Sequence, residues 1–131
     1  MSKIPRTFRL LEELENSSKI NGVSYGLEDP TDNNFIKWTG SLIANTGHFI
    51  CLSFECKPDY PTSRPIVQFD KEYKSRTKKD YDDEMGTYVE RLNALCVSGT
   101  SSLADSVLSW NDKKTIGSYL EELKKKIVGS N

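Results

Sequence analysis

Hydrophobic and polar residues alternate strictly along two neighbouring stretches in the first half of the chain. Within residues 35–44, one face carries Ile36, Trp38, Leu42 and Ala44. Within residues 49–56, the corresponding face carries Ile50, Leu52, Phe54 and Cys56. A period of two over such lengths predicts strands with one buried face. The intervening Asn45-Thr46-Gly47 favours a turn that joins them as a hairpin.

Two shorter strands are predicted on either side of this pair. Residues 23–27 alternate with Val23, Tyr25 and Leu27 on the inward side, and residues 65–69 form a short apolar stretch. Three prolines in residues 57–65 remove backbone donors, so this connection does not continue the ladder. The pattern predicts a four-stranded antiparallel meander whose apolar face needs a cover.

Helical periodicity appears near both ends of the chain. Residues 5–15 predict a helix with Pro5 in its first turn and an apolar stripe made of Leu10, Leu11 and Leu14. Phe8 projects roughly 110° from the centre of that stripe, which favours a contact with another protein. Packing under the N-terminal tail and chance exposure of one apolar residue are the alternatives.

The second helix is predicted after Thr115, which is suited to cap it. Its apolar stripe consists of Ile116, Tyr119, Leu120, Leu123 and Ile127. This amphipathic helix is the natural cover for the sheet. The complete pattern predicts an α+β fold: an N-terminal helix, a four-stranded antiparallel meander and a C-terminal covering helix.

Charged residues dominate the stretch after the fourth strand. Residues 70–84 are expected to form a solvated loop, although apolar residues at helical spacing predict a short amphipathic helix between Tyr81 and Leu95. Gly86 weakens that helix, and residues 96–105 are expected to form a loop rich in Ser, Gly and Thr.

The composition is that of a single soluble domain spanning residues 1–131. A net charge of −1 provides no field that attracts nucleic acid or an anionic membrane. The sequence has no apolar run long enough to span a bilayer and no signal peptide. Its three cysteines form no CxxC motif, which favours a reducing compartment, and we expect the protein in the cytoplasm and nucleus. With one histidine, His48, we expect no metal site and no cofactor.

Three sequence strings carry a resemblance to a known family. The chain resembles the ubiquitin-conjugating enzyme variants in the strings PRTFRLLEELE, SYGLED and KWTGSL, followed by the Tyr60-Pro61 box. Members of that family are catalytically inactive cofactors of an active conjugating enzyme. The similarity covers residues 2–69 closely, is weak at 92–97 and returns at 107–127. It implies the ubiquitin-conjugating fold without the two further C-terminal helices of active enzymes, and a cis Tyr60-Pro61 bond. Arg64 replaces a proline usual in the family, and residues 70–91 are a charged insertion.

The catalytic signature of an active conjugating enzyme is missing from the sequence. The family pattern is a His-Pro-Asn triplet, a cysteine about ten residues later and then Trp-x-Pro, and none of these is present. Cys51 and Cys56 fall inside a predicted strand, and Cys96 has no cationic neighbour in sequence to lower its pKa. We therefore predict a protein that is non-catalytic by itself.

The resemblance implies two binding surfaces. Phe8, with Pro5 and Arg6 beside it, would bind an active ubiquitin-conjugating enzyme as a heterodimer. Ser24, Ser41 and Phe49, which alternate onto the outer face of three strands, match the family positions that contact acceptor ubiquitin. Phe49 could instead be covered by the insertion, and His48 is expected to be a surface histidine beside the turn.

Three functions remain open from the sequence. The leading one is a cofactor for lysine-63-linked polyubiquitin synthesis (the number is a site on ubiquitin), with roles in signalling and DNA-damage tolerance. The second is a ubiquitin- or peptide-binding module of a sorting complex. The third is a transferase that uses Cys96.

Overall fold

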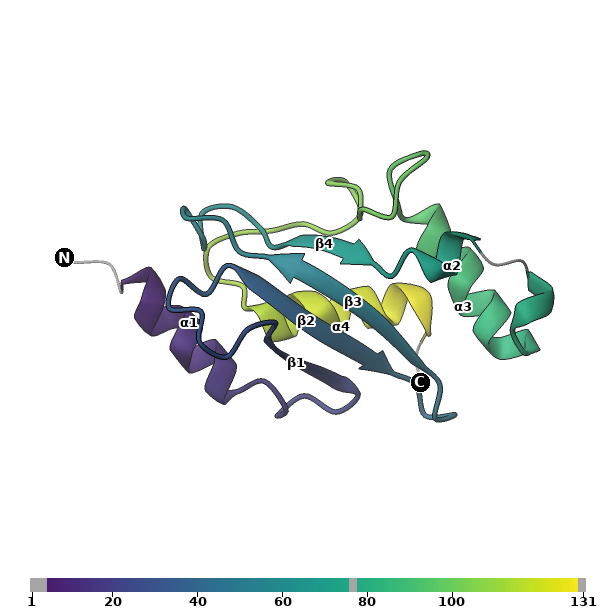
Figure 1. Cartoon of the computed structure of the whole chain (residues 1–131), viewed down its shortest axis with the longest axis horizontal. Coiled ribbons are helices and arrows are strands. Elements are labelled where there is room, and N and C mark those ends of the chain that lie inside the picture. The colour runs from purple at the N-terminus through teal and green to yellow at the C-terminus, as the bar shows by residue number, and fades with distance from the viewer. Residues whose placement is uncertain (1–4, 76–77, 130–131) are drawn as a thin grey trace.

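The protein folds as one four-stranded antiparallel sheet with helices on one face and at both ends. A computed structural model describes residues 5–75 and 78–129. The strands β1 (Val23–Leu27), β2 (Lys37–Ile43), β3 (Phe49–Glu55) and β4 (Ile66–Phe69) lie in that order across the sheet. Helix α4 (Ile116–Ile127) lies across one face, while α1 (Arg6–Glu15) and the pair α2 (Glu72–Ser75) and α3 (Asp83–Ala94) lie at opposite ends of the molecule (Figure 1). This arrangement confirms the predicted α+β architecture.

The strand register places the predicted apolar face against α4. Leu42 pairs with Val23 on one side and Ile50 on the other, and Trp38 pairs with Leu27 and Phe54. All these side chains except Leu27, which is partly buried, are almost inaccessible. Trp38 also stacks on Phe54 with ring centres 5.6 Å apart. The alternation visible in the sequence is therefore the alternation of core and surface.

Helix α4 covers the sheet as its amphipathic stripe predicts. The Thr115 side chain accepts a hydrogen bond from the Ser118 backbone N–H, and the Ser118 hydroxyl returns one to complete a capping box. The five residues of the predicted stripe are all buried: Ile116, Tyr119, Leu120, Leu123 and Ile127.

Helix α1 is rotated from the orientation that its leucines predict. Leu10 is buried, but Leu11 is 44% exposed, so its assignment to the buried stripe is wrong. The side chain that joins Leu10 in the interior is the carboxylate of Glu13, which is only 4% exposed. Leu11 lies about 100° from Leu10 around the helix axis, so turning Glu13 inward moves Leu11 outward.

The segment after β4 is more ordered than a solvated loop. It forms α2 and a 3-10 turn (η1, Lys78–Asp80), and Tyr73 is buried, so the loop prediction for residues 70–84 is wrong there; residues 76–77 of that prediction lie outside the described residues. The predicted amphipathic helix is confirmed as α3, capped by Asp82, whose side chain accepts the Met85 N–H. It buries Tyr88, Val89 and Leu92, and Arg91 donates to the Ile127 carbonyl 2.9 Å away at the end of α4.

The proline connection adopts the conformation that the resemblance implies. The Tyr60-Pro61 bond is cis, and the Trp110 indole N–H donates to the Pro61 carbonyl at 2.9 Å. Arg64, which departs from the family pattern, forms an ion pair with Asp105 in the loop before α4. Among the described residues, no helix is both long and apolar enough to cross a membrane.

Candidate binding surfaces

The exposed side of α1 carries two large apolar side chains. Phe8 is 65% exposed and Leu11 is 44% exposed. Because they are three residues apart, they lie on the same side of the helix, about 60° from each other. Pro5 is exposed at the start of the helix. Phe8 therefore does not pack against the described part of its own chain, and Leu11 is a neighbour that the sequence pattern had placed in the core.

Arg6 holds this helix in place. Its guanidinium donates to the carbonyls of Asn34 at 2.5 Å, Cys56 at 2.8 Å and Lys57 at 3.1 Å, with a longer bond to Phe35 at 3.3 Å. These carbonyls belong to the chain just before β2 and just after β3. The half-buried guanidinium thus fixes the helix that presents Phe8.

Glu13 anchors the other end of α1. Its carboxylate accepts short hydrogen bonds from the Tyr60 hydroxyl and from the Ile116 backbone N–H, and Arg9 lies 3.8 Å away. Loss of water around the buried carboxylate raises the pKa of Glu13, and the bonds from Tyr60 and Ile116 oppose this increase. The helix is therefore attached at both ends to the sheet and to α4, so that Phe8 projects from a rigid support.

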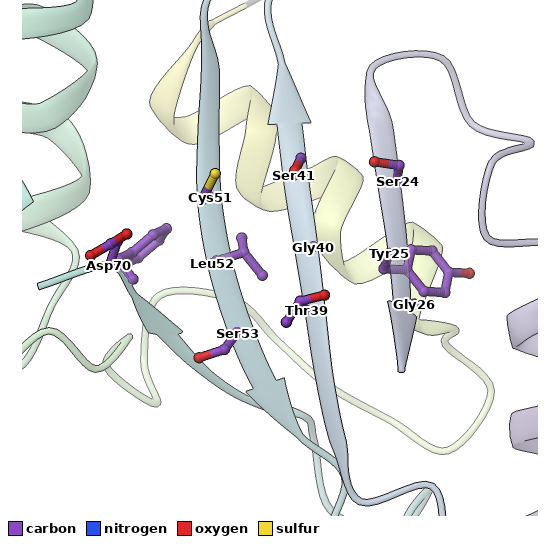
Figure 2. A pocket seen from close by; sticks show the side chains of 11 residues that line it. Ser24, Tyr25, Gly26, Thr39, Gly40, Ser41, Cys51, Leu52, Ser53 and Asp70 are labelled. Carbon is purple, nitrogen blue, oxygen red and sulfur yellow. The ribbon is translucent and has the colours of Figure 1, made fainter. Parts of the chain in front are cut away.

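The outer face of the sheet is lined by small polar side chains. Ser24 pairs with Ser41, and Ser41 pairs with Cys51, so the three lie side by side on β1, β2 and β3 (Figure 2). The next outward row along the strands contains Gly26, Thr39 and Ser53. These small residues line a shallow hollow of about 540 Å³ that Asp70 borders beyond β4.

An exposed apolar pair lies beside this hollow. Phe49 pairs with Ile43 across the β2–β3 hairpin, and they are 56% and 40% exposed. They lie one outward row beyond Ser41 and Cys51. The described residues after β4 therefore leave Phe49 accessible. The structure brings Ser24, Ser41 and Phe49 onto one face, and it adds Ile43 and Cys51, which the same alternation places there.

His48 lies at the surface beside the turn, as expected, and it also contacts the N-terminal end of α3. Its Nε2 lies 2.6 Å from Asp82 Oδ2, its Nδ1 lies 2.7 Å from Thr46 Oγ1, and its ring contacts Tyr88 edge-on. The side chain is 24% exposed. No local pattern indicates this contact, because Asp82 is 34 residues away.

Cys56 and Cys96 lie in settings that disfavour a thiolate. Cys56 is buried, and burial raises the pKa of its thiol strongly. Cys96 is half-buried, donates to the Leu92 carbonyl at 3.2 Å, and has a pKa raised by the same loss of solvent. The positive charge of Lys74 lowers the pKa of Cys96, but the loss of solvent outweighs it, so neither thiol is activated as a nucleophile. Within residues 5–75 and 78–129, no three potential metal ligands cluster together.

Curated relatives match the chain over nearly its whole length. The ubiquitin-conjugating enzyme variant MMS2 of Saccharomyces cerevisiae is 31% identical, covering 98% of this chain and 88% of that protein. The ubiquitin-conjugating enzyme E2 variant 1C of Arabidopsis thaliana is 33% identical, covering 97% and 83%. The chain belongs to the ubiquitin-conjugating enzyme variants. No protein-family model matches the sequence.

Solved structures confirm the fold of this variant. A putative ubiquitin-conjugating enzyme from Plasmodium yoelii superposes with a TM-score of 0.66 at 19% identity, covering 100% of this chain and 77% of that one. Human ubiquitin-conjugating enzyme E2 G1 superposes with a TM-score of 0.63 at 17% identity, covering 96% and 98%. At these identities the likeness extends to the ubiquitin-conjugating fold alone.

Proposed function

We propose that this variant pairs with an active ubiquitin-conjugating enzyme and holds acceptor ubiquitin for synthesis of lysine-63-linked chains. The observation that carries the proposal is the exposed Phe8 on a helix fixed at both ends by Arg6 and Glu13. A large aromatic on a rigid support is the kind of side chain that dominates protein interfaces. Relatives named as ubiquitin-conjugating enzyme variants support a role beside conjugating enzymes.

The chemistry assigned to this variant is positioning. Chain synthesis is aminolysis: a lysine amine of acceptor ubiquitin attacks the thioester carbonyl on the partner enzyme, and the enzyme's thiolate leaves. Holding the amine beside the thioester makes a bimolecular reaction effectively unimolecular and is worth several kcal/mol. A protein with no activated thiol can supply this contribution, and the raised pKa of Cys96 fits that role.

Acceptor ubiquitin is assigned to the outer face of the sheet. Ser24 and Ser41 provide hydroxyls beside a shallow hollow, and Phe49 with Ile43 provides an apolar contact next to it. This face and the exposed side of α1 belong to different parts of the molecule (Figure 1), so both ligands can be bound at once. We propose the cytoplasm and nucleus as its compartments and signalling or DNA-damage tolerance as its pathways.

Reconstitution from purified components tests the proposal. Activating enzyme, ubiquitin and ATP are mixed with candidate conjugating enzymes, with and without this protein. We expect free lysine-63-linked chains only when both proteins are present, and their loss with Phe8→Ala. Ubiquitin binding without any stimulation of chain synthesis by any conjugating enzyme would instead favour the binding-module function.

A further inference from the structure

The outer half of β3 extends beyond the end of β4. The β3–β4 ladder begins at Leu52, paired with Phe69, and runs to Glu55. Phe49, Ile50 and Cys51 therefore pair with β2 alone within the sheet. Residues at such a strand end lack the ladder bonds that restrain the rest of β3, although Phe49 is the largest side chain of the proposed acceptor surface.

Described residues of the segment 70–91 hydrogen-bond to the chain on both sides of Phe49. The Cys51 backbone N–H donates to the Tyr73 hydroxyl at 2.8 Å, which occupies a donor that β4 does not reach. Three residues earlier, His48 Nε2 donates to the Asp82 carboxylate at 2.6 Å. Phe49 lies between the two attachment points.

The attachments belong to an ordered unit. Asp82 uses Oδ1 to cap α3 through the Met85 N–H and Oδ2 to contact His48. These bonds hold the pKa of Asp82 below its usual value, so the side chain is a carboxylate at neutral pH. The Asn93 side chain donates to the Tyr73 carbonyl at 3.2 Å, which ties α2 to the end of α3. Tyr73 in α2 and Asp82 at the N-terminus of α3 thus contact this end of the β2–β3 hairpin from helical elements.

We propose that the insertion is a positioning element for acceptor binding: Tyr73 and Asp82 fix the outer end of β3 and thereby the orientation of Phe49. This inference rests on the proposed acceptor surface. One hydrogen bond on each side of Phe49 orders the strand before ubiquitin binds. A contact that is already ordered avoids a conformational cost on binding. Tyr73 and Asp82 act through Phe49 and do not themselves contact ubiquitin.

A double-mutant cycle with Phe49 tests this assignment. The first variant combines Tyr73→Phe, which removes only the hydroxyl, with Asp82→Ser, which keeps an N-cap acceptor but loses the oxygen that meets His48. The matched control is Asp83→Ser, because Asp83 is the exposed next residue of the same helix. Ubiquitin affinity is measured by NMR titration of labelled ubiquitin, with and without Phe49→Ala in each protein.

We expect the double variant to bind ubiquitin about three- to tenfold more weakly. Its affinity for the partner enzyme and its melting temperature should be unchanged. In the Phe49→Ala background the same changes should reduce ubiquitin affinity by less than about twofold, since the effects of coupled sites are not additive.

Equal losses of affinity in both backgrounds, or an equal loss with Asp83→Ser, would overturn the inference. If Phe49→Ala itself leaves ubiquitin affinity unchanged, the proposed acceptor surface fails as well. If Phe49→Ala weakens binding and the insertion variants do not, only the present inference fails.

Discussion

Glu13 of α1 accepts a hydrogen bond from the backbone N–H of Ile116, the first residue of α4, 103 positions further along the chain. The donor is one of the N–H groups that a helix start leaves without an intrahelical partner. The carboxylate also accepts from the Tyr60 hydroxyl, so a single buried side chain joins α1, the proline connection and α4. The orientation of α1, and hence of Phe8, depends on this contact.

The stability contributed at Glu13 should depend on pH in a specific direction. Burial raises its pKa above the usual 4.5, so the folded chain binds a proton more readily than the unfolded chain. The free energy of unfolding of the wild type, relative to Glu13→Gln, should therefore rise as the pH falls through the folded pKa towards 4.5. Urea unfolding of both proteins across this range measures the difference. A difference that shrinks on acidification would show that the carboxylate is favoured in the folded state.

Variants at Arg6 and Phe8 should have different effects, the first on stability and the second on partner binding. Arg6→Ala removes donors from four backbone carbonyls and should lower the free energy of unfolding by about 1–3 kcal/mol. Phe8→Ala should change it by less than about 0.5 kcal/mol, because the ring is exposed. The same Phe8 variant should weaken the heterodimer by about 2–4 kcal/mol, or roughly 30- to 1,000-fold in Kd.

Urea unfolding and calorimetric titration with the partner enzyme measure these two quantities. Leu11→Ala is the neighbouring control on the same side of α1, and we expect a smaller loss of affinity than with Phe8→Ala. Full partner affinity in Phe8→Ala would refute the anchor assignment.

Substitutions in the acceptor surface should slow chain synthesis without weakening the heterodimer. Replacing Ser24, Ser41 and Phe49 together with alanine should reduce kcat/KM for acceptor ubiquitin by roughly tenfold, or about 1.4 kcal/mol. The reason is that these residues share the outer face beside the hollow, away from α1. Steady-state chain synthesis against ubiquitin concentration gives the value, and titration with the partner enzyme is the control. Loss of the heterodimer in this variant would mean that the two surfaces are misassigned.

Cys96 should be dispensable for chain synthesis. Its pKa is raised and its thiol donates to the Leu92 carbonyl, so little thiolate is present at neutral pH. Cys96→Ser should retain chain synthesis in the reconstituted mixture, and the wild-type protein incubated alone with activating enzyme and ubiquitin should form no reducible adduct. A ubiquitin adduct that is lost with reductant and with Cys96→Ser would establish a transferase instead.

Local patterns predicted the sheet and both flanking helices, because alternation and helical periodicity are properties of neighbouring residues. The same alternation placed Ser24, Ser41 and Phe49 on the outer face, and the angle of Phe8 from its leucine stripe indicated exposure. Family membership was recognisable from the N-terminal strings and agrees with relatives about 30% identical.

The errors involve contacts between distant residues. Leu11 was misplaced because the rotation of α1 depends on Glu13 reaching Tyr60 and Ile116, which no local pattern reveals. Helix α2 and the 3-10 turn η1 were missed because their charged residues resemble a solvated loop, whereas Tyr73 is buried and bonds to β3. The contacts of His48 with Asp82 and Tyr88 were not predicted because these residues are far from it in the sequence.

The shortness of β4 also has a consequence for self-association. A strand that extends beyond the end of its neighbour exposes unpaired backbone groups. A second molecule can add a strand there, and this is a common route to aggregation. Here the Tyr73 hydroxyl occupies the Cys51 N–H at that edge. We therefore expect loss of the Tyr73 hydroxyl to make intermolecular strand pairing at this edge easier.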